Sequence, residues 1–169
     1  MPRLIPAYFE VEFDFYTDML KEEFDKLGSE SEDPIGQYIK LAKARGETKE
    51  TDPVLLELLI ALHRKIDELS AYIKQEVKEY EKLGFKSEIT GVGFEYFQIK
   101  DDILKKGEKY YGRMSLPVFP PRVVGVIFTA ESENLAKIML MHQKDTQDYN
   151  AFIMARERAI IREMKGKNG

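Results

Sequence analysis

The chain has 169 residues, a formal net charge of −4 and 33% charged residues. This length is enough for one domain with its own core, and the acidic balance argues against a general nucleic-acid surface, which requires a basic excess. The chain contains no cysteine, which excludes disulfides, thiolate catalysis and thiolate metal sites. We see no apolar run long enough for a signal peptide or a membrane span, so we expect a cytoplasmic protein without membrane insertion.

Residues 1–14 are predicted to form the first strand. Phenylalanine and valine alternate with acidic residues over 9–15, which is the period of a half-buried strand. The same segment also has apolar residues at helical spacing, so a helix continuing to Phe24 is the alternative. We favour a strand to about Phe13 and a helix after it.

Residues 15–50 are expected to form a helical insertion. Its first helix ends ahead of Gly28, and a polar loop follows. Pro34 begins a second, short helix that ends before Gly46, and a charged stretch then leads to the next element.

Residues 52–84 are predicted to form a long helix with a heptad repeat. Apolar residues spaced alternately four and three apart lie in one narrow stripe of a helix. The predicted seam consists of Leu55, Leu59, Leu62, Ile66, Leu69, Ile73, Glu76, Tyr80 and Leu83. A lone small domain has little need for such a stripe, so we expect a homo-oligomer, from dimer to tetramer, through residues 52–83. A bundle within one chain is the alternative, because Val54 and Leu58 widen the apolar face near the helix start.

After Gly84 the apolar residues recur at every second position. The five segments with this pattern are 85–89, 92–98, 108–116, 122–130 and 134–142, and the first turn between them is expected at residues 90–91. Short strands at close spacing predict that residues 85–142 form a small antiparallel β-barrel. A last helix is predicted over 145–166. The expected fold class is therefore α+β, a barrel with an inserted heptad helix and a carboxy-terminal helix.

Residues 88–94, which read Glu-Ile-Thr-Gly-Val-Gly-Phe, resemble the Asp/Asn-x-Ser-x-x-Gly turn of PilZ domains. Three further segments are similar to features of that family and stand where it places them. Residues 59–67 resemble the helix inserted in its tetramer-forming branch, 121–126 its proline-marked strand start, and 155–162 its closing helix. The resemblance covers most of the chain after Thr51.

PilZ domains are small β-barrels that serve many bacteria as cyclic di-GMP receptors. The resemblance implies a ligand site at Arg3, Glu88, Thr90 and Gly93. Members that bind the ligand carry two arginines four residues apart before the first strand, whereas this chain has Ala7 at the second position. Glu88 and Thr90 also replace the family's Asp or Asn and Ser. The resemblance therefore implies a degenerate site, and we expect no cofactor and weak or no binding of cyclic di-GMP.

The sequence favours a protein that is not an enzyme. His63 and His142 have no second histidine or close carboxylate at metal-ligand spacing, and we recognise no pairing of a nucleophile with a base. We expect a non-catalytic bacterial regulatory or adaptor module that contacts an unknown protein partner. The alternative is a functional cyclic di-GMP receptor with altered geometry, which would use arginines such as Arg122 or Arg162.

Overall fold

The computed structural model describes residues 3–29, 34–73, 80–118 and 121–167. In chain order the elements are β1 (Ile5–Phe15), α1 (Asp18–Ser29), α2 (Pro34–Ala44), α3 (Pro53–Ile73), β2 (Phe85–Val92), β3 (Tyr96–Ile99), β4 (Lys109–Leu116), β5 (Arg122–Ala130), β6 (Leu135–Met141) and α4 (Gln143–Lys167). The chain divides into two compact units, Met1–Gly28 with Tyr80–Gly169, and Ser29–Glu79. Each unit is described by itself.

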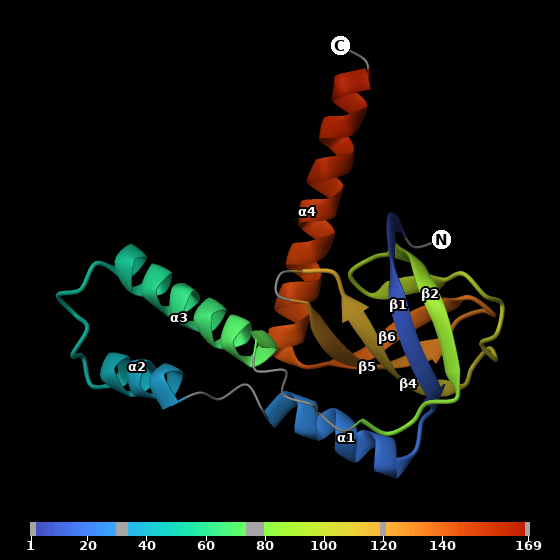
Figure 1. Cartoon of the computed structure of the whole chain (residues 1–169), viewed down its shortest axis with the longest axis horizontal. Helices are drawn as coiled ribbons and strands as arrows, with labels where there is room; N and C mark the ends of the chain where they lie inside the picture. The colour runs from blue at the N-terminus through green and yellow to red at the C-terminus, as the bar shows by residue number, and fades with distance from the viewer. Residues whose placement is uncertain (1–2, 30–33, 74–79, 119–120, 168–169) are drawn as a thin grey trace. The chain divides into compact units, whose positions relative to one another are not determined.

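The first unit contains a closed antiparallel barrel with the strand order β1-β2-β3-β6-β5-β4 (Figure 1). The predicted small antiparallel barrel and the α+β class are thereby confirmed. β1 closes the barrel, because it pairs with β2 on one side and with β4 on the other. The apolar and acidic residues that alternate in the sequence of β1 also alternate in burial. Phe9, Val11 and Phe13 point into the barrel, and the acidic residues between them point outward.

The predicted turn at residues 90–91 is wrong. β2 continues through these residues to Val92, and the turn follows at Gly93, whose N–H donates to the Tyr96 carbonyl over 2.8 Å. Glycine at residue 91 indicated a turn, but Gly91 lies in the strand where Leu4 approaches it, 3.3 Å from where a Cβ would stand. Close approach of the chain, and not a change of direction, explains this glycine.

Aromatic rings fill the barrel. Phe13 lies 5.7 Å from Tyr110 and 6.0 Å from Phe128, measured between ring centroids. Tyr149 and Ile153 of α4 join the same core. The carboxy-terminal half of α4 extends away from the barrel (Figure 1).

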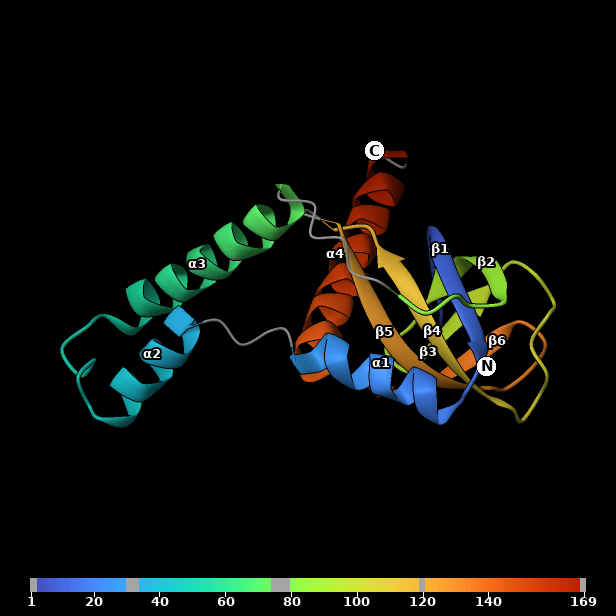
Figure 2. The same cartoon turned by 60° about the horizontal axis from the view of Figure 1, so that its bottom comes forward.

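α1 covers the outside of the barrel (Figure 2). Leu20 and Phe24 form a second small apolar cluster with Tyr111 of β4 and Ile127 of β5. His142 stacks on Phe24 with ring centroids 4.0 Å apart. This helix therefore gives the barrel a second, outer core.

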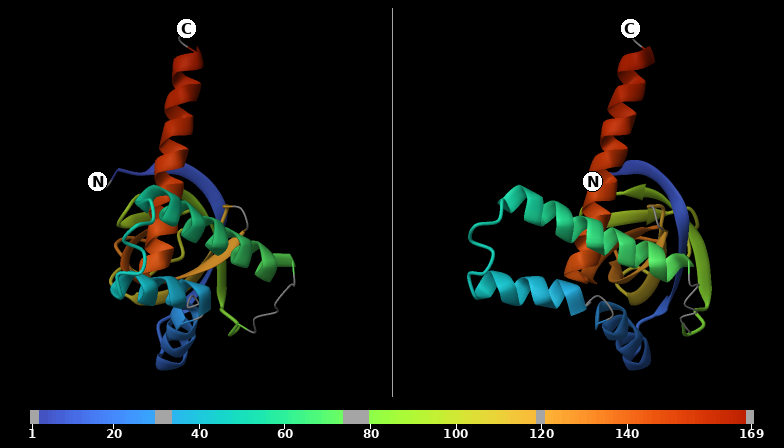
Figure 3. Two further views of the ribbon diagram at one scale, coloured as in Figure 1. Left: turned by 90° about the vertical axis from the view of Figure 1, so that its left-hand side faces the viewer. Right: turned by 60° about the vertical axis from the view of Figure 1, so that its left-hand side comes forward.

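The second unit contains α2 and α3, which contact each other and run antiparallel as a helical hairpin (Figure 3). Asp52 caps α3, because its carboxylate accepts a hydrogen bond of 2.9 Å from the Val54 N–H.

The predicted heptad helix over 52–84 is longer than α3. The structure describes α3 to Ile73, and Glu76 lies outside the described residues. The expectation is wrong for Tyr80 and Leu83, which are not helical and belong to the barrel unit. Leu83 packs against the outer cluster beneath α1, and that tertiary contact outweighs its heptad spacing.

Candidate functional site

Two of the four residues predicted to bind a ligand lie side by side. Gly93 is so close to the amino-terminal segment that an added Cβ would stand 2.9 Å from the Arg3 carbonyl oxygen. Tyr149 of α4 donates a hydrogen bond of 2.9 Å to the Gly93 carbonyl. Arg3 and Gly93 therefore meet beside α4.

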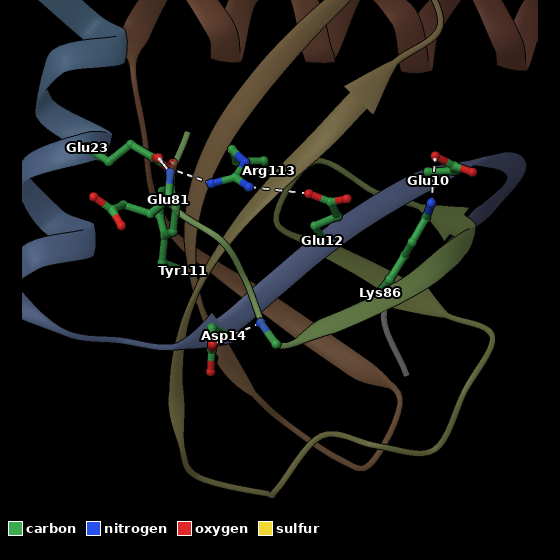
Figure 4. A network of polar contacts seen from close by, with 9 residues as sticks. Glu10, Glu12, Asp14, Glu23, Glu81, Lys86, Tyr111 and Arg113 are labelled. Atoms are coloured by element: carbon green, nitrogen blue, oxygen red, sulfur yellow. Dashed lines mark hydrogen bonds and ion pairs between the residues drawn. The ribbon is translucent and has the colours of Figure 1, made fainter. Parts of the chain in front are cut away.

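Glu88 and Thr90 lie further along β2, on its outer face. A strand rises about 3.3 Å per residue, which places Glu88 roughly 16 Å from Gly93. Glu88 stands opposite Glu10 of β1, and Lys86 pairs with Glu10 over 3.7 Å (Figure 4). Two neighbouring carboxylates disfavour a phosphate ligand on this stretch of the surface.

The guanidinium of Arg3 is already engaged. It pairs with Glu157 of α4 over 2.7 Å, although the Arg3 side chain is 82% exposed. Ala7, the place of the missing second arginine, is 2% exposed and points into the barrel core. An arginine there would bury an unpaired charge. Substituting arginine at residue 7 would therefore not restore the pair of arginines that binds the ligand in the family.

A shallow hollow lies on the outside of β1 and β2 next to Glu88. Its lining consists of Tyr8, Phe9, Glu10, Lys86, Ser87, Glu88, Lys100 and Asp101. Polar groups of this lining bind one another, since Ser87 donates to Asp101 over 2.8 Å and Lys86 pairs with Glu10. The hollow mixes both signs of charge and selects no ligand class.

A buried ionic network joins α1 to the barrel (Figure 4). Arg113 of β4 is 7% exposed and Glu23 of α1 is 10% exposed, and their side chains pair over 2.9 Å. Arg113 also pairs with Glu12 of β1 over 3.2 Å, and Tyr111 donates a hydrogen bond to Glu23. Sequence reasoning missed this network, because Glu23 and Arg113 lie 90 residues apart in the chain.

The environment of this network shifts two pKa values upward. Burial, followed by the hydrogen bond and charge of Glu23, raises the pKa of Tyr111. Burial acts to lower the pKa of Arg113, but the hydrogen bond and charge of Glu23 outweigh it and the net shift is upward. Both groups therefore stay protonated at neutral pH, so Tyr111 keeps its hydrogen-bond donor and Arg113 keeps its positive charge there.

The same network holds the segment that leads into β2. Glu23 accepts a hydrogen bond of 2.6 Å from the Glu81 N–H, and the Tyr80 ring stacks 4.9 Å from the Arg113 guanidinium. The Gly84 N–H donates to Asp14 over 2.9 Å. These contacts attach residues 80–84 to the barrel unit.

The two arginines of the alternative receptor hypothesis have different surroundings. Arg122 lies between Asp145 and Asp148 of α4 and pairs with both carboxylates. Burial raises the pKa of Asp145, and the charge of Arg122 opposes that shift. Arg162 is exposed on the projecting half of α4. The structure brings neither of them into contact with Arg3 or Gly93 through any described interaction.

Both histidines have polar partners within the chain. His63 pairs with Asp67 one helical turn away over 3.1 Å, and His142 Nε2 lies 2.5 Å from the Phe24 carbonyl oxygen. Among the residues that the structure describes, no group of three or more histidine, aspartate or glutamate side chains is arranged to hold a metal ion.

The predicted oligomerisation surface lies on α3. Its seam residues Leu55, Leu59, Leu62 and Ile66 are between 51% and 57% exposed. Ile73 is more exposed, while Leu69 is half-buried. Contiguous exposed leucines of this kind are unusual on the surface of a monomer.

Comparison with known proteins found no matching protein-family model, curated protein or solved structure. In the part of the chain that is described, none of the helices combines the length and apolar character needed to cross a membrane.

Proposed function

We propose that this chain is a non-catalytic cytoplasmic regulatory or adaptor module of PilZ type, which self-associates through α3 and acts by contact with another protein. The observation that carries the proposal is the exposed seam of Leu55, Leu59, Leu62 and Ile66. Burying one such side chain fully stabilises an interface by about 1.5–3 kcal/mol, so four half-exposed side chains supply a substantial driving force.

The contacts around the degenerate ligand site support an adaptor more than a receptor. The Arg3 guanidinium is paired with Glu157, and Ala7 faces the core. A ligand phosphate would have to displace Glu157 and would meet a single arginine. Each charged hydrogen bond that is lost removes about 1.5–3 kcal/mol from binding.

Sedimentation velocity over a range of micromolar concentrations tests the assembly. We expect a dimer to tetramer, because the α3 seam exposes more apolar surface than a single chain normally leaves uncovered. A wild-type chain that stays monomeric throughout this range would refute self-association and would mean that the seam is covered within one chain.

Calorimetric titration with cyclic di-GMP tests the ligand site. We expect no binding, or a dissociation constant weaker than about 100 μM, since two missing charged contacts remove roughly 3–6 kcal/mol. Glu157→Gln, which frees Arg3 from its ion pair, is the matched variant. Micromolar binding by the wild-type chain would overturn the adaptor proposal.

One observation favours the second candidate, a cyclic di-GMP receptor with altered geometry. Arg3 and Gly93 are adjacent, as a ligand site at these residues requires. In that case Arg3→Ala should weaken binding more than Arg158→Ala, because Arg3 adjoins Gly93 whereas Arg158 is an exposed residue of α4 outside the predicted site.

A further inference from the structure

α2 carries exposed apolar residues that the heptad pattern does not include. Tyr38 is 68% exposed and Leu41 is 55% exposed. They are three residues apart and so lie on the same side of the helix. Both residues belong to the same unit as α3.

The position of the α3 seam around its helix axis follows from helical geometry. Leu56 and Ile60 are partly buried, and α3 contacts α2, so we infer that these two residues mark the side of α3 that faces α2. Each residue of a helix turns about 100° from the previous one, which puts the seam centred on Leu59 and Leu62 about 100° away from that contact.

The same geometry places the exposed residues of α2. Ala42 is buried and Ile39 is partly buried, so we infer in the same way that they mark the side of α2 that faces α3. Tyr38 and Leu41 are centred about 100° around the helix from them. Their offset has the same rotational sense as that of the α3 seam, and α2 runs antiparallel to α3 (Figure 3). In an antiparallel pair of helices, residues with equal offsets from the contact lie on the same side, so both sets lie on one side of the hairpin.

We infer that the two helices present a single apolar surface to a second copy of this chain, so that the assembly interface is two helices wide. This surface, called here the hairpin face, consists of Tyr38, Leu41, Leu55, Leu59, Leu62 and Ile66. The inference rests on the proposed self-association and adds α2 to it. Pairing of two hairpin faces produces a four-helix bundle, in which each copy contributes α2 and α3.

The area of the hairpin face supports a second copy as its occupant. At about 60–100 Å² of newly covered surface for each side chain, the six residues bury roughly 400–600 Å² per copy. The backbone and the flanking side chains of two packed hairpins add to this, which brings the contact near the about 800 Å² per partner of a standard interface. The α3 seam alone supplies less, and the side chains that it presents from Leu55 to Ile66 carry no charge.

Charge substitutions with neighbouring controls test the inference. Leu41→Glu places a charge in the hairpin face from α2, and Leu62→Glu does so from α3. Lys40→Glu and Ala61→Glu are the controls, because both residues are exposed on the same helices but point away from the face. Sedimentation velocity should show that each of the first two raises the dissociation constant at least about tenfold, and that neither control does.

The outcomes separate the two proposals. Dissociation by Leu62→Glu together with undisturbed assembly of Leu41→Glu would overturn the two-helix interface and would leave self-association through α3 standing. A monomeric wild-type chain would overturn both. Tyr38→Lys repeats the test on α2 with the opposite charge, and helical content by circular dichroism must match the wild type for a variant to count as dissociated.

A second measurement does not depend on disrupting the assembly. The chain has no cysteine, so Tyr38→Cys and Lys40→Cys each introduce a single thiol. Labelling of the first by a thiol reagent should slow by about tenfold when the protein concentration is raised well above the dissociation constant, since only dissociated copies react. Labelling of the second should stay constant. Equal behaviour of the two thiols would refute the inference.

Discussion

Removal of Arg113 tests whether the buried ionic network holds α1 and the segment before β2 on the barrel. The variant Arg113→Met keeps most of the side-chain volume and deletes the charge. Glu23 would then be a buried carboxylate whose remaining partners are the Tyr111 hydroxyl and the Glu81 N–H. Neither of these neutralises its charge.

The expected loss of stability follows from the burial of the pair. Breaking a buried ion pair by removing one partner costs about 3–5 kcal/mol, because the other charge stays buried without compensation. Because Glu23 keeps two hydrogen bonds in the variant, we expect a loss of unfolding free energy at the lower end of this range, about 3 kcal/mol. For a chain of this size that corresponds to a fall of roughly 6–12 °C in the thermal midpoint.

The measurement is thermal unfolding followed by the near-ultraviolet circular dichroism of tyrosine, at one fixed protein concentration. Lys86→Met is the matched control, because it breaks an ion pair with Glu10 in which both side chains are more than 60% exposed. Exposed pairs contribute about 0–1 kcal/mol. Equal midpoints for Arg113→Met and Lys86→Met would refute the structural role of the network. The double variant Arg113→Met/Glu23→Leu should recover part of the loss, since no charge is then left buried.

Three further predictions concern the barrel. Gly93→Ala should lower stability by about 1–3 kcal/mol, because the new Cβ would stand 2.9 Å from the Arg3 carbonyl oxygen and the amino-terminal segment must shift. Amide hydrogen exchange of Leu4 and Ile5 that matches the wild type would contradict this. Tyr149→Phe should lower the free energy of unfolding, measured with urea, by about 1–3 kcal/mol, because the buried Gly93 carbonyl loses its hydrogen-bond donor. An unchanged urea midpoint would show that this hydrogen bond contributes nothing to stability. The thermal midpoint should fall as the pH rises above about 10, because burial and Glu23 raise the pKa of Tyr111 and the unfolded chain then releases a proton that the folded chain retains. A midpoint that is constant between about pH 9 and 11 would contradict that linkage.

The strands of the barrel could be predicted from the sequence, because strand alternation is a local property. Phe9, Val11 and Phe13 alternate with acidic residues, and their burial requires only that one side of a strand face a core. The turn at residues 90–91 was predicted wrongly for the same reason. Local rules treat a glycine as a turn signal, whereas the approach of Leu4 to Gly91 is a tertiary contact that no local pattern contains.

The candidate site also shows the difference between local sequence patterns and tertiary contacts. The α3 seam was predictable from spacing alone, and the resemblance to PilZ domains named Arg3 and Gly93, which the structure places next to each other. Sequence spacing could not show that Glu157 forms an ion pair with the Arg3 guanidinium, since 154 residues separate the two. A charged residue within the apolar strand around Arg113 was a signal that could have drawn attention to the buried network, but it did not identify Glu23.

The sequence by itself determined the periodicities of this protein, and hence the strands of the barrel, the helices of the hairpin and the amphipathic stripe from Leu55 to Ile66. The tertiary structure alone decided that Tyr80 and Leu83 belong to the barrel unit, and which charged side chains meet. Leu83 continues the heptad spacing, yet it packs beneath α1 because its burial there, together with the hydrogen bond from Gly84 to Asp14, outweighs a further turn of exposed helix. Helical and strand periods act over a few residues, whereas burial and ion pairing depend on which distant segments the closed barrel brings into contact.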